Sequence, residues 1–507
     1  MEYIWGMKKV ILLSVIFLAL NTLMAQNVFN RKYNPNNAES RAEIVVATSD
    51  TGYLAAGFTN NGLVLGATKT NYLGDTLWSF ILELGINVGN YLFTAIEVTD
   101  GNYIVGGMSG DPILHRSHAT LIKLNKNTGD TIWVRKIGLP DRSERNYSVK
   151  QTPDNGFIFC GLRFNEDSIG HTTDDDVYLV KTDSMGIPQW EKTYGGSNYD
   201  YAQSVELTAE GGYMILGTTY SYGVGQYNMY LIKTDSLGNM LWQKTYGGSL
   251  EDYGQSIVKM NDGNYALAGG TYVSTDTLAG YILKIDTAGI VIWQKKYRGI
   301  IKQQEFSGVK QLPTGELVVC GSMQGDTLNN SFYGIVKKLN ENDGSAVWQN
   351  QYQYYNTDST QHYFYGIDLC LDGGLVMAGM STNFHHGVNP ANSMWLVKTD
   401  CMGNDSIWDS INCSLPIGVS EVVAKEINDV LVYPNPNNGQ MTLSYHLAQA
   451  AELSIYDMQG RRLITYTLPP NNQTLNLNLD QLNAGIYYYS LHTHDKQLKT
   501  EKLVIVK

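Results

Sequence analysis

The chain has 507 residues, of which 43% are hydrophobic and 17% are charged, so its composition excludes a disordered protein and indicates several globular domains. The formal net charge of -12 argues against a nucleic-acid partner, because phosphate binding needs a basic surface. The 51 glycines and 35 tyrosines are typical of many short strands and turns.

The N-terminal segment is basic at Lys8 and Lys9 and then apolar from Val10 to Leu20. This apolar run is too short to cross a bilayer, so no transmembrane span is expected, and the pattern predicts a secretory signal peptide over residues 1–25. Gln26 follows the expected cleavage site, and the absence of a cysteine there argues against a lipoprotein.

Residues 26 to 413 contain a sequence repeat, and its clearest copy is GGYMILGTTYSYGVGQYNMYLIKTDSLGNMLWQKTYGG at 211–248. Each copy ends in a strand with a tryptophan, at intervals of 51 to 60 residues: Trp78, Trp133, Trp190, Trp242, Trp293, Trp348 and Trp408. Repeats of about this length, each with four short strands, predict an all-β, seven-bladed β-propeller. A β-solenoid is the alternative, but its repeats are normally much shorter.

A turn precedes each tryptophan strand. The turns begin with Asn71, Asn125, Asp183, Asp235, Asp286, Asn340 and Asp400, and they close with Gly74, Gly129, Gly186, Gly238, Gly289, Gly344 and Gly403. Asp and Asn bond their own backbone and Gly tolerates positive φ, so both residue types serve chain reversal. A calcium site is disfavoured, because three of the leading residues are neutral Asn, and no metal site is predicted.

The segment Val28–Tyr33 aligns with Gln189–Tyr194, the outer strand of a repeat. A lone outer strand ahead of the first repeat is suited to pair with the last repeat and leave no free edge. The Trp408 strand competes for that place, so either it is displaced or Phe29 belongs to an eighth blade. We favour seven blades.

The turn-and-tryptophan segments KLNKNTGDTIWVRK (123–136) and KLNENDGSAVWQ (338–349) resemble the tryptophan-docking motif of quinoprotein-type propellers. The resemblance implies that each tryptophan packs between adjacent blades. Nothing in the sequence matches the quinone site that some of these propellers carry, so no cofactor is expected.

Five cysteines in an exported chain do not pair completely. Cys160 and Cys320 occupy apolar strand positions and Cys370 looks similar, so all three are expected to be buried thiols. Cys401 and Cys413 flank the last tryptophan strand and are predicted to form a disulfide.

After a linker at 414–428, residues 429–507 alternate in a way that predicts a small β-sandwich. The motifs VYPNPNNGQMTL, LSIYDMQGRRL, LNAGIYYYSL and EKLVIVK resemble the C-terminal sorting domain of type IX secretion substrates. The motif residues are Pro434, Asn435, Pro436, Gly439, Asp457, Gly460, Arg461, Gly485, Tyr487 and Lys507.

The resemblance implies an immunoglobulin-like fold that the secretion machinery recognises. It also implies a protein that is secreted or attached to the outer surface of a Gram-negative bacterium, after export to the periplasm. In many members the tail is removed and the passenger is attached to lipopolysaccharide.

The passenger has no nucleophile elbow, no phosphate loop and no metal-ligand spacing, so no catalytic residue is predicted. The loops that break the repeat carry histidines, which predicts a ligand-binding face with His115, His118, His171, His385 and His386. We expect a monomeric binding or adhesion module for a glycan or protein. The alternative is a polysaccharide hydrolase or lyase, which the expected lack of unrepeated acidic pairs in the inner strands disfavours.

Overall fold

The structure is a computed structural model of the chain. It describes residues 27–35, 38–59, 62–83, 89–111, 113, 116–166, 172–298, 303–326, 331–355, 360–383, 392–405, 431–433, 440–447, 450–457, 461–469, 471–492 and 497–506. The chain forms two compact units, Met1–Cys413 and Ser414–Lys507. No helix among the described residues is long and apolar enough to cross a membrane.

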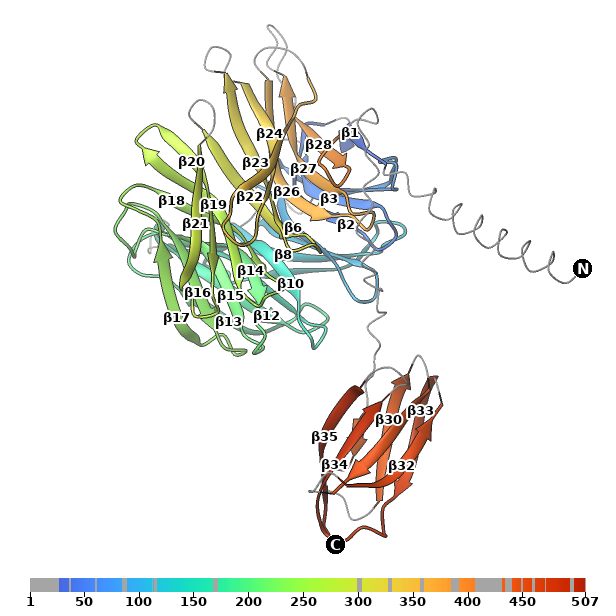
Figure 1. The fold of residues 1–507 in the computed structure, drawn as a ribbon. Helices are drawn as coiled ribbons and strands as arrows, with labels where there is room; N and C mark the ends of the chain where they lie inside the picture. Colours follow the sequence, from blue (N-terminus) through green and yellow to red (C-terminus); the bar gives the residue numbers. More distant parts are fainter. Residues whose placement is uncertain are drawn as a thin grey trace, which may run out of the picture. The chain divides into compact units, whose positions relative to one another are not determined.

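The first unit consists of repeats of antiparallel strands (Figure 1). The first strands of the repeats are β2 (Ser40–Ala47), β6 (Tyr91–Glu97), β10 (Ser143–Gln151), β14 (Asp200–Leu207), β18 (Asp252–Lys259), β22 (Gln304–Gln311) and β26 (Thr360–Leu369). The second strands are β3 (Tyr53–Thr59), β7 (Tyr103–Asp111), β11 (Phe157–Glu166), β15 (Tyr213–Thr219), β19 (Tyr265–Ser274), β23 (Leu317–Asp326) and β27 (Leu375–Asn383). The third strands are β4 (Val64–Thr70), β8 (Arg116–Leu124), β12 (Thr172–Thr182), β16 (Asn228–Thr234), β20 (Thr277–Ile285), β24 (Ser331–Leu339) and β28 (Ser393–Thr399).

The outer strands are β5 (Thr76–Leu82), β9 (Thr131–Ile137), β13 (Pro188–Tyr194), β17 (Met240–Tyr246), β21 (Val291–Arg298) and β25 (Ala346–Tyr352). Repeats 1 to 5 are separate four-stranded sheets, whereas one parallel bridge between Phe332 and Gln361 joins repeats 6 and 7. Second and third strands such as β15 and β16 are buried on both faces. They are covered on both sides because the apolar side chains of adjacent repeats form shared core clusters.

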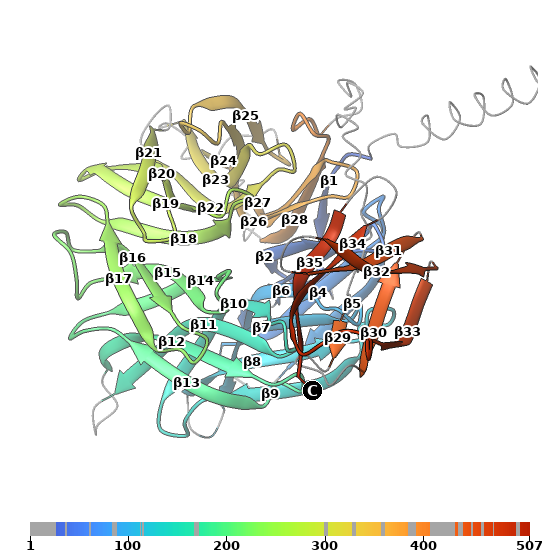
Figure 2. The same ribbon diagram turned by 60° about the horizontal axis from the view of Figure 1, so that its bottom comes forward.

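The first strands face a common centre (Figure 2), and each contacts the first strand of the next repeat, with β26 against β2. Each of them has a β-bulge at the same position, for example between Ala42 and Ile44 in β2 and between Ala202 and Ser204 in β14. A bulge inserts one extra residue and bends the strand. In each repeat, one side chain therefore departs from the alternation between the two faces of the sheet. This side chain lies on the strand that faces the centre.

Each described outer-strand tryptophan from Trp78 to Trp348 packs on the turn glycine of the next repeat. A Cβ at Gly129 would come within 2.5 Å of Trp78, and one at Gly344 within 2.6 Å of Trp293. These glycines also have positive φ, 74° at Gly129 and 69° at Gly344, so the turn and the tryptophan both require glycine. The indole nitrogen of Trp78 donates to the carbonyl of Lys126 at 3.0 Å. The inter-repeat tryptophan packing implied by the sequence resemblance is confirmed.

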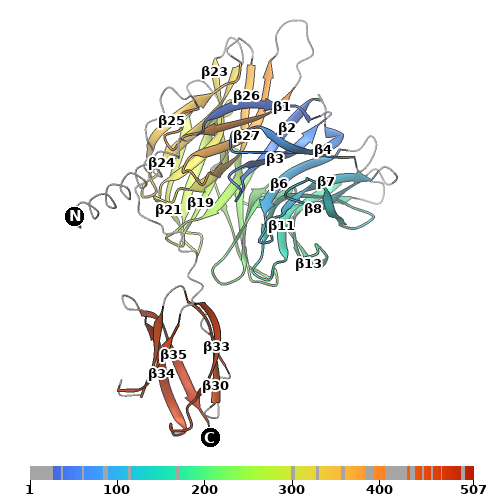
Figure 3. The same ribbon diagram turned by 90° about the vertical axis from the view of Figure 1, so that its right-hand side faces the viewer.

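The N-terminal strand β1 (Phe29–Tyr33) pairs antiparallel with β28, as the alignment predicted (Figure 1). Figure 3 shows β1 from another side, near β27 of the last repeat and β2 of the first. It also takes over the docking role of an outer strand, because Phe29 packs on Gly74 of the first repeat. The hydroxyl of Tyr33 donates to the Gly74 carbonyl at 2.6 Å, as Tyr194 does to Gly238 at 2.5 Å. The free side of β28 is thus occupied by β1, and Trp408 lies outside the described residues.

A buried or half-buried lysine and an acidic residue form an ion pair in every repeat, joining the end of the third strand to the turn between the first two strands. The pairs are Lys69–Asp50, Lys123–Asp100, Lys181–Asp154, Lys233–Glu210, Lys284–Asp262, Lys338–Glu316 and Lys398–Asp372. The Lys398 side chain is 0% exposed, and its Nζ also donates to the Thr399 carbonyl at 2.8 Å. A buried ammonium is tolerated only when it is paired and hydrogen-bonded, so this motif holds the turn to the sheet.

The second unit is a β-sandwich. One sheet consists of β29 (Leu431–Tyr433), β30 (Gln440–Leu447) and β33 (Asn471–Asn478), and the other of β32 (Arg462–Leu468), β31 (Ala451–Tyr456), β34 (Gly485–His492) and β35 (Gln497–Ile505). Met441 and Leu443 of the first sheet share one buried cluster with Leu453, Leu491 and Leu503 of the second. The all-β character predicted for this part of the chain is confirmed.

Candidate functional site

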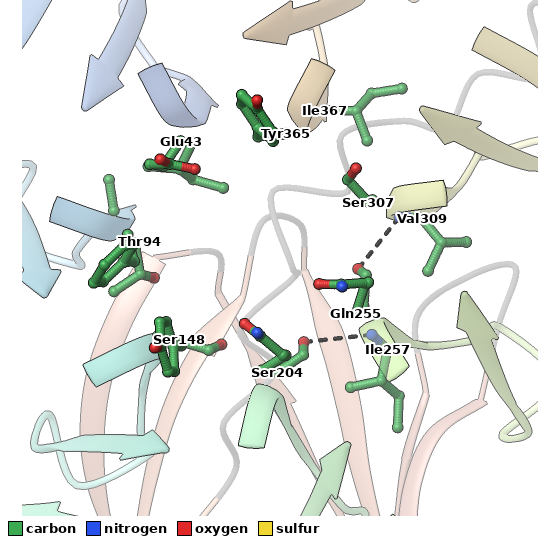
Figure 4. Close-up of a pocket in the computed structure, with 18 of the residues that line it drawn as sticks. Glu43, Thr94, Ser148, Ser204, Gln255, Ile257, Ser307, Val309, Tyr365 and Ile367 are labelled. Atoms are coloured by element: carbon green, nitrogen blue, oxygen red, sulfur yellow. Dashed lines mark hydrogen bonds between the residues drawn. The ribbon is translucent and has the colours of Figure 1, made fainter. Parts of the chain in front are cut away.

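The first strands surround a cavity of about 450 Å³ on the axis of the first unit. Every repeat contributes to its lining, and the labelled side chains in Figure 4 surround one open space. The volume lies in the range of small-molecule sites, roughly 300–1,000 Å³. The axial cavity is therefore large enough to be a ligand site.

The side chain at the bulge reaches this cavity in each repeat. In chain order these residues are Glu43, Phe93, Tyr147, Gln203, Gln255, Ser307 and Tyr365. The backbone position is repeated but the residue type is not. Because residues that serve only the repeat would recur, this ring is where the chain departs from its own template.

The lining is divided into three walls. The aromatic wall is Phe93 and Tyr147, whose ring centroids lie 4.8 Å apart, with Tyr91 stacked behind Phe93 at 5.8 Å. The amide wall is Gln203 and Gln255. The charged wall is Arg41, Glu43, Glu305 and Tyr365, from repeats 6, 7 and 1.

The charged wall is organised by Arg41. Its Nε lies 2.7 Å from Oε1 of Glu43, and its Nη2 donates to Oε2 at 3.2 Å. The guanidinium carbon lies 3.8 Å from the ring centroid of Tyr365, which is a cation–π contact. Arg41 therefore joins repeat 1 to repeat 7 at the cavity wall.

The two carboxyl groups of this wall differ in their partners. Burial raises the pKa of Glu43, while the adjacent Arg41 opposes that shift. Burial also raises the pKa of Glu305, and its carboxylate accepts a hydrogen bond from the Ser322 hydroxyl at 3.4 Å. Glu43 is thus held as an ion pair, whereas Glu305 has a weak neutral donor and the more distant charge of Arg41.

Two further ion pairs connect neighbouring repeats around the cavity. Lys150 Nζ lies 2.9 Å from Glu206, and Lys310 Nζ lies 2.9 Å from Asp368. Asp368 also accepts from the Ala47 backbone at 3.0 Å. For Lys310, burial lowers the pKa, but Asp368 and the more distant Glu206 raise it, and the net shift is upward, which favours the ammonium. These four residues are neutralised by one another and tie repeats together.

A belt of hydroxyl groups joins the first strands of repeats 2 to 6. Thr94, Ser148, Ser204 and Ser256 accept from the backbone nitrogen of the next repeat's first strand at 3.1, 3.3, 3.3 and 3.2 Å (two of these bonds are dashed in Figure 4). The corresponding residues in repeats 6, 7 and 1 are Gly308, Gly366 and Ile44, which have no hydroxyl. The belt ends where the charged wall begins.

The expected lack of unrepeated acids in the inner strands is wrong. Glu43, Glu206, Glu305 and Asp368 all lie on first strands and have no counterpart in most repeats. The sequence argument failed because Glu43 occupies a bulge and the others alternate with apolar residues, so they resembled the solvent side of an ordinary strand. The aromatic and amide residues were missed for the same reason.

Of the five predicted histidines, the structure describes His118 alone. It lies on β8 with a side chain 12% exposed, and its Nδ1 is 3.8 Å from Oε2 of the fully buried Glu144. Burial lowers the pKa of His118, which favours the neutral imidazole. His115, His171, His385 and His386 lie outside the described residues, so the histidine face stays a prediction.

Cys160 and Cys320 are buried free thiols, as predicted, and Cys370 is a half-buried free thiol just after β26. Cys413 lies outside the described residues, and the disulfide with Cys401 stays a prediction. Within the described ranges, no group of three or more His, Cys, Asp or Glu side chains could hold a metal ion.

In the second unit, four sorting-motif residues are described. Arg461 donates from its backbone nitrogen to Asp457 Oδ1 at 2.9 Å and from Nε to Oδ2 at 3.0 Å, which joins the residue after β31 to the residue before β32. The Tyr487 hydroxyl donates to the Asn483 carbonyl at 3.0 Å, just before Gly485 at the start of β34. Pro434, Asn435, Pro436, Gly439, Gly460 and Lys507 lie outside the described residues.

Residues 431–506 match the family described as "Secretion system C-terminal sorting domain". This match supports the assignment of the chain as a type IX secretion substrate. A tail of this class implies interaction with the type IX machinery and secretion out of the cell or attachment to its outer surface. No curated protein matches the chain.

Several solved structures resemble the chain weakly, and they are propeller-like. Sqt1 from Chaetomium thermophilum has 10% identity and a TM-score of 0.41, covering 74% of this chain and 99% of that chain. Quinohemoprotein alcohol dehydrogenase from Comamonas testosteroni has 10% identity and a TM-score of 0.43, covering 74% and 76%. The α-L-arabinanase of Penicillium chrysogenum, complexed with arabinobiose, has 12% identity and a TM-score of 0.42, covering 61% and 92%. All these TM-scores are below 0.5, so they carry no argument about function.

Proposed function

We propose that the protein is exported by the type IX system and that its passenger binds a short carbohydrate in the axial cavity. The passenger is a seven-bladed propeller that β1 closes, and the tail is an immunoglobulin-like sandwich over residues 429–507. Residues 1–25 serve as the signal peptide for the periplasmic step. The pairing of β1 with β28 and the contact of β26 with β2 support the closed ring.

The observation that carries the binding proposal is the unequal lining of the axial cavity. An aromatic wall can stack on the apolar face of a sugar ring, as offset aromatic pairs stack on each other. Glutamine amides both donate and accept, which suits hydroxyl groups of a sugar. Arg41 and the two glutamates add charged hydrogen-bond partners on the third wall. Together these groups match a polar ring with one apolar face.

The test is a glycan array with the purified protein, followed by equilibrium binding of the best oligosaccharide. Tyr147→Ala removes half of the aromatic wall and Gln255→Ala half of the amide wall, so each should weaken binding about tenfold, the equivalent of roughly 1.4 kcal/mol. Tyr199→Ala is the matched control, because Tyr199 is 42% exposed outside the cavity lining. Unchanged affinity in both cavity variants would place the ligand elsewhere.

The export proposal has its own test. A chain without residues 429–507 should fold its passenger but remain in the periplasm, because the sorting tail is missing. Fractionation of the producing bacterium measures this. Normal delivery of the truncated chain to the surface or the medium would refute the role of the tail.

A further inference from the structure

The charged wall coincides with a break in the repeat architecture. In repeats 2 to 5 the residue after the bulge is a hydroxyl that bonds the next repeat. In repeats 6 and 7 it is Gly308 or Gly366, and a Cβ at Gly366 would lie 3.0 Å from the Cα of Ile44. Repeat 7 therefore approaches repeat 1 closely, at the side of the cavity where Arg41, Glu43 and Tyr365 meet.

We propose that the axial cavity also hydrolyses its carbohydrate ligand, with Glu305 as the general acid and Glu43 as the general base. This inference rests on the proposed binding of a carbohydrate in the same cavity. Glycoside hydrolysis needs two carboxyl groups that face one bound sugar and have different protonation states. The cavity holds two carboxyl groups on one wall with different partners.

Glu305 is suited to carry the proton. Its side chain lies on β22, the Ser322 hydroxyl is a long 3.4 Å away, and burial favours the neutral carboxylic acid. A buried acid with a raised pKa keeps its proton to higher pH than a free glutamic acid does, and it can donate that proton to a leaving oxygen.

Glu43 is suited to act as the base because it is ion-paired with Arg41, although burial raises its pKa as it raises that of Glu305. The bidentate contact with Arg41, at 2.7 and 3.2 Å, opposes the effect of burial and stabilises the carboxylate. Arg41 is itself fixed against the Tyr365 ring, so it acts as a positioning residue for Glu43. The other cavity acid, Glu206, is neutralised by Lys150 and stands apart from this wall.

The reaction balances with water as the co-reactant. Glu305 donates its proton to the glycosidic oxygen as the bond between that oxygen and the anomeric carbon breaks. Glu43 accepts a proton from water as the water oxygen forms a new bond to the anomeric carbon. The products are a hemiacetal and an alcohol, and proton exchange with solvent restores both glutamates.

The test measures reducing-end release by the full chain from xylan, mannan, arabinan and chitin oligosaccharides, beside equilibrium binding of the same probes. The parent should cleave at least one probe. Glu305→Gln and Glu43→Gln should each lower the rate at least about a hundredfold and retain binding within a few-fold, because general acid–base groups contribute roughly 10²–10⁴. Exposed Glu83 provides the matched control, and Glu83→Gln should cleave at the parental rate.

The outcomes separate the two proposals. Binding in the cavity without turnover would overturn hydrolysis and leave the binding proposal standing, whereas absence of both would overturn both. Turnover that survives Glu305→Gln and Glu43→Gln would overturn the residue assignment. Loss of the high-pH limb of the rate profile in Glu305→Gln would support it, since that limb reports the acid. Tryptophan fluorescence of each variant verifies folding, and Glu305→Asp, which keeps the acid and shortens its reach, should retain partial activity.

Discussion

The replacement Phe29→Ala tests how β1 stabilises the ring. Phe29 is 7% exposed, its ring lies edge-on to Tyr53 with centroids 5.6 Å apart, and it packs in a cluster with Val376 and Met394 of the last repeat. Truncation of a buried Phe to Ala usually costs about 3–5 kcal/mol, because transfer and cavity contributions add. We expect about 3 kcal/mol, since β1 is an edge strand.

The assay is urea unfolding followed by tryptophan fluorescence. All 9 tryptophans lie before residue 409, so the signal does not report the sorting tail. The midpoint should fall with little change in slope. Tyr33→Phe and Tyr194→Phe form a matched pair, because each removes one hydroxyl bond to a turn glycine, and each should cost about 1 kcal/mol.

If β1 only rests on the surface of repeat 7, Phe29→Ala will unfold at the parental midpoint. Tyr33→Phe will then also be silent while Tyr194→Phe is not. That combination would refute the closure of the ring by β1.

Three further predictions concern stability. Lys398→Met should lower the free energy of unfolding in urea by about 2 kcal/mol, a value between those for buried and exposed ion pairs. Lys233→Met should cost less, because its ion pair is 3.8 Å apart and more exposed. Equal costs for the two variants would contradict the role of burial. Burial raises the pKa of Glu144 from 4.5 to about 7. Between these pH values the folded state keeps a proton that the unfolded state releases. The contribution of Glu144 to stability is therefore lost as the pH rises over this range. Glu144→Gln should therefore gain stability relative to the parent between pH 4.5 and 7, and a constant difference would refute this. Non-reducing mass spectrometry of the exported protein should find Cys401 joined to Cys413, a link worth about 3 kcal/mol; two free thiols would contradict it.

The repeat architecture could be predicted from the sequence because it depends on local sequence patterns. The turn that starts at Asp183 shows why: its Oδ1 accepts from the backbone nitrogens of Met185 and Ile187 at 2.9 Å, which is the chain reversal that Asp and Gly together indicate. The place of β1 followed from the same logic, since Phe29 and Tyr33 occupy the repeat positions of Trp190 and Tyr194.

The lining of the axial cavity could not be predicted from the sequence, because it depends on contacts between strands that are far apart in the chain. A β-bulge has no residue signature of its own in these strands, so nothing marked Glu43, Gln255 or Tyr365 as facing the axis. Repeats 6 and 1 are also far apart in the sequence, so the proximity of Glu305 to Arg41 could not be predicted. The lysine–carboxylate pairs were not predicted for a simpler reason. A lysine at the end of a strand is indistinguishable in sequence from an exposed one, because its carboxylate partner lies in a different turn.

The most direct measurement of the central claim is a crystal structure of the protein with the best oligosaccharide from the glycan array. The account predicts one sugar ring in the axial cavity, stacked on Phe93 or Tyr147 and hydrogen-bonded to Gln203 or Gln255, with the neighbouring linkage at Glu305. A sugar bound on the outer strands or on the loop face, with the axial cavity filled by water, would contradict it.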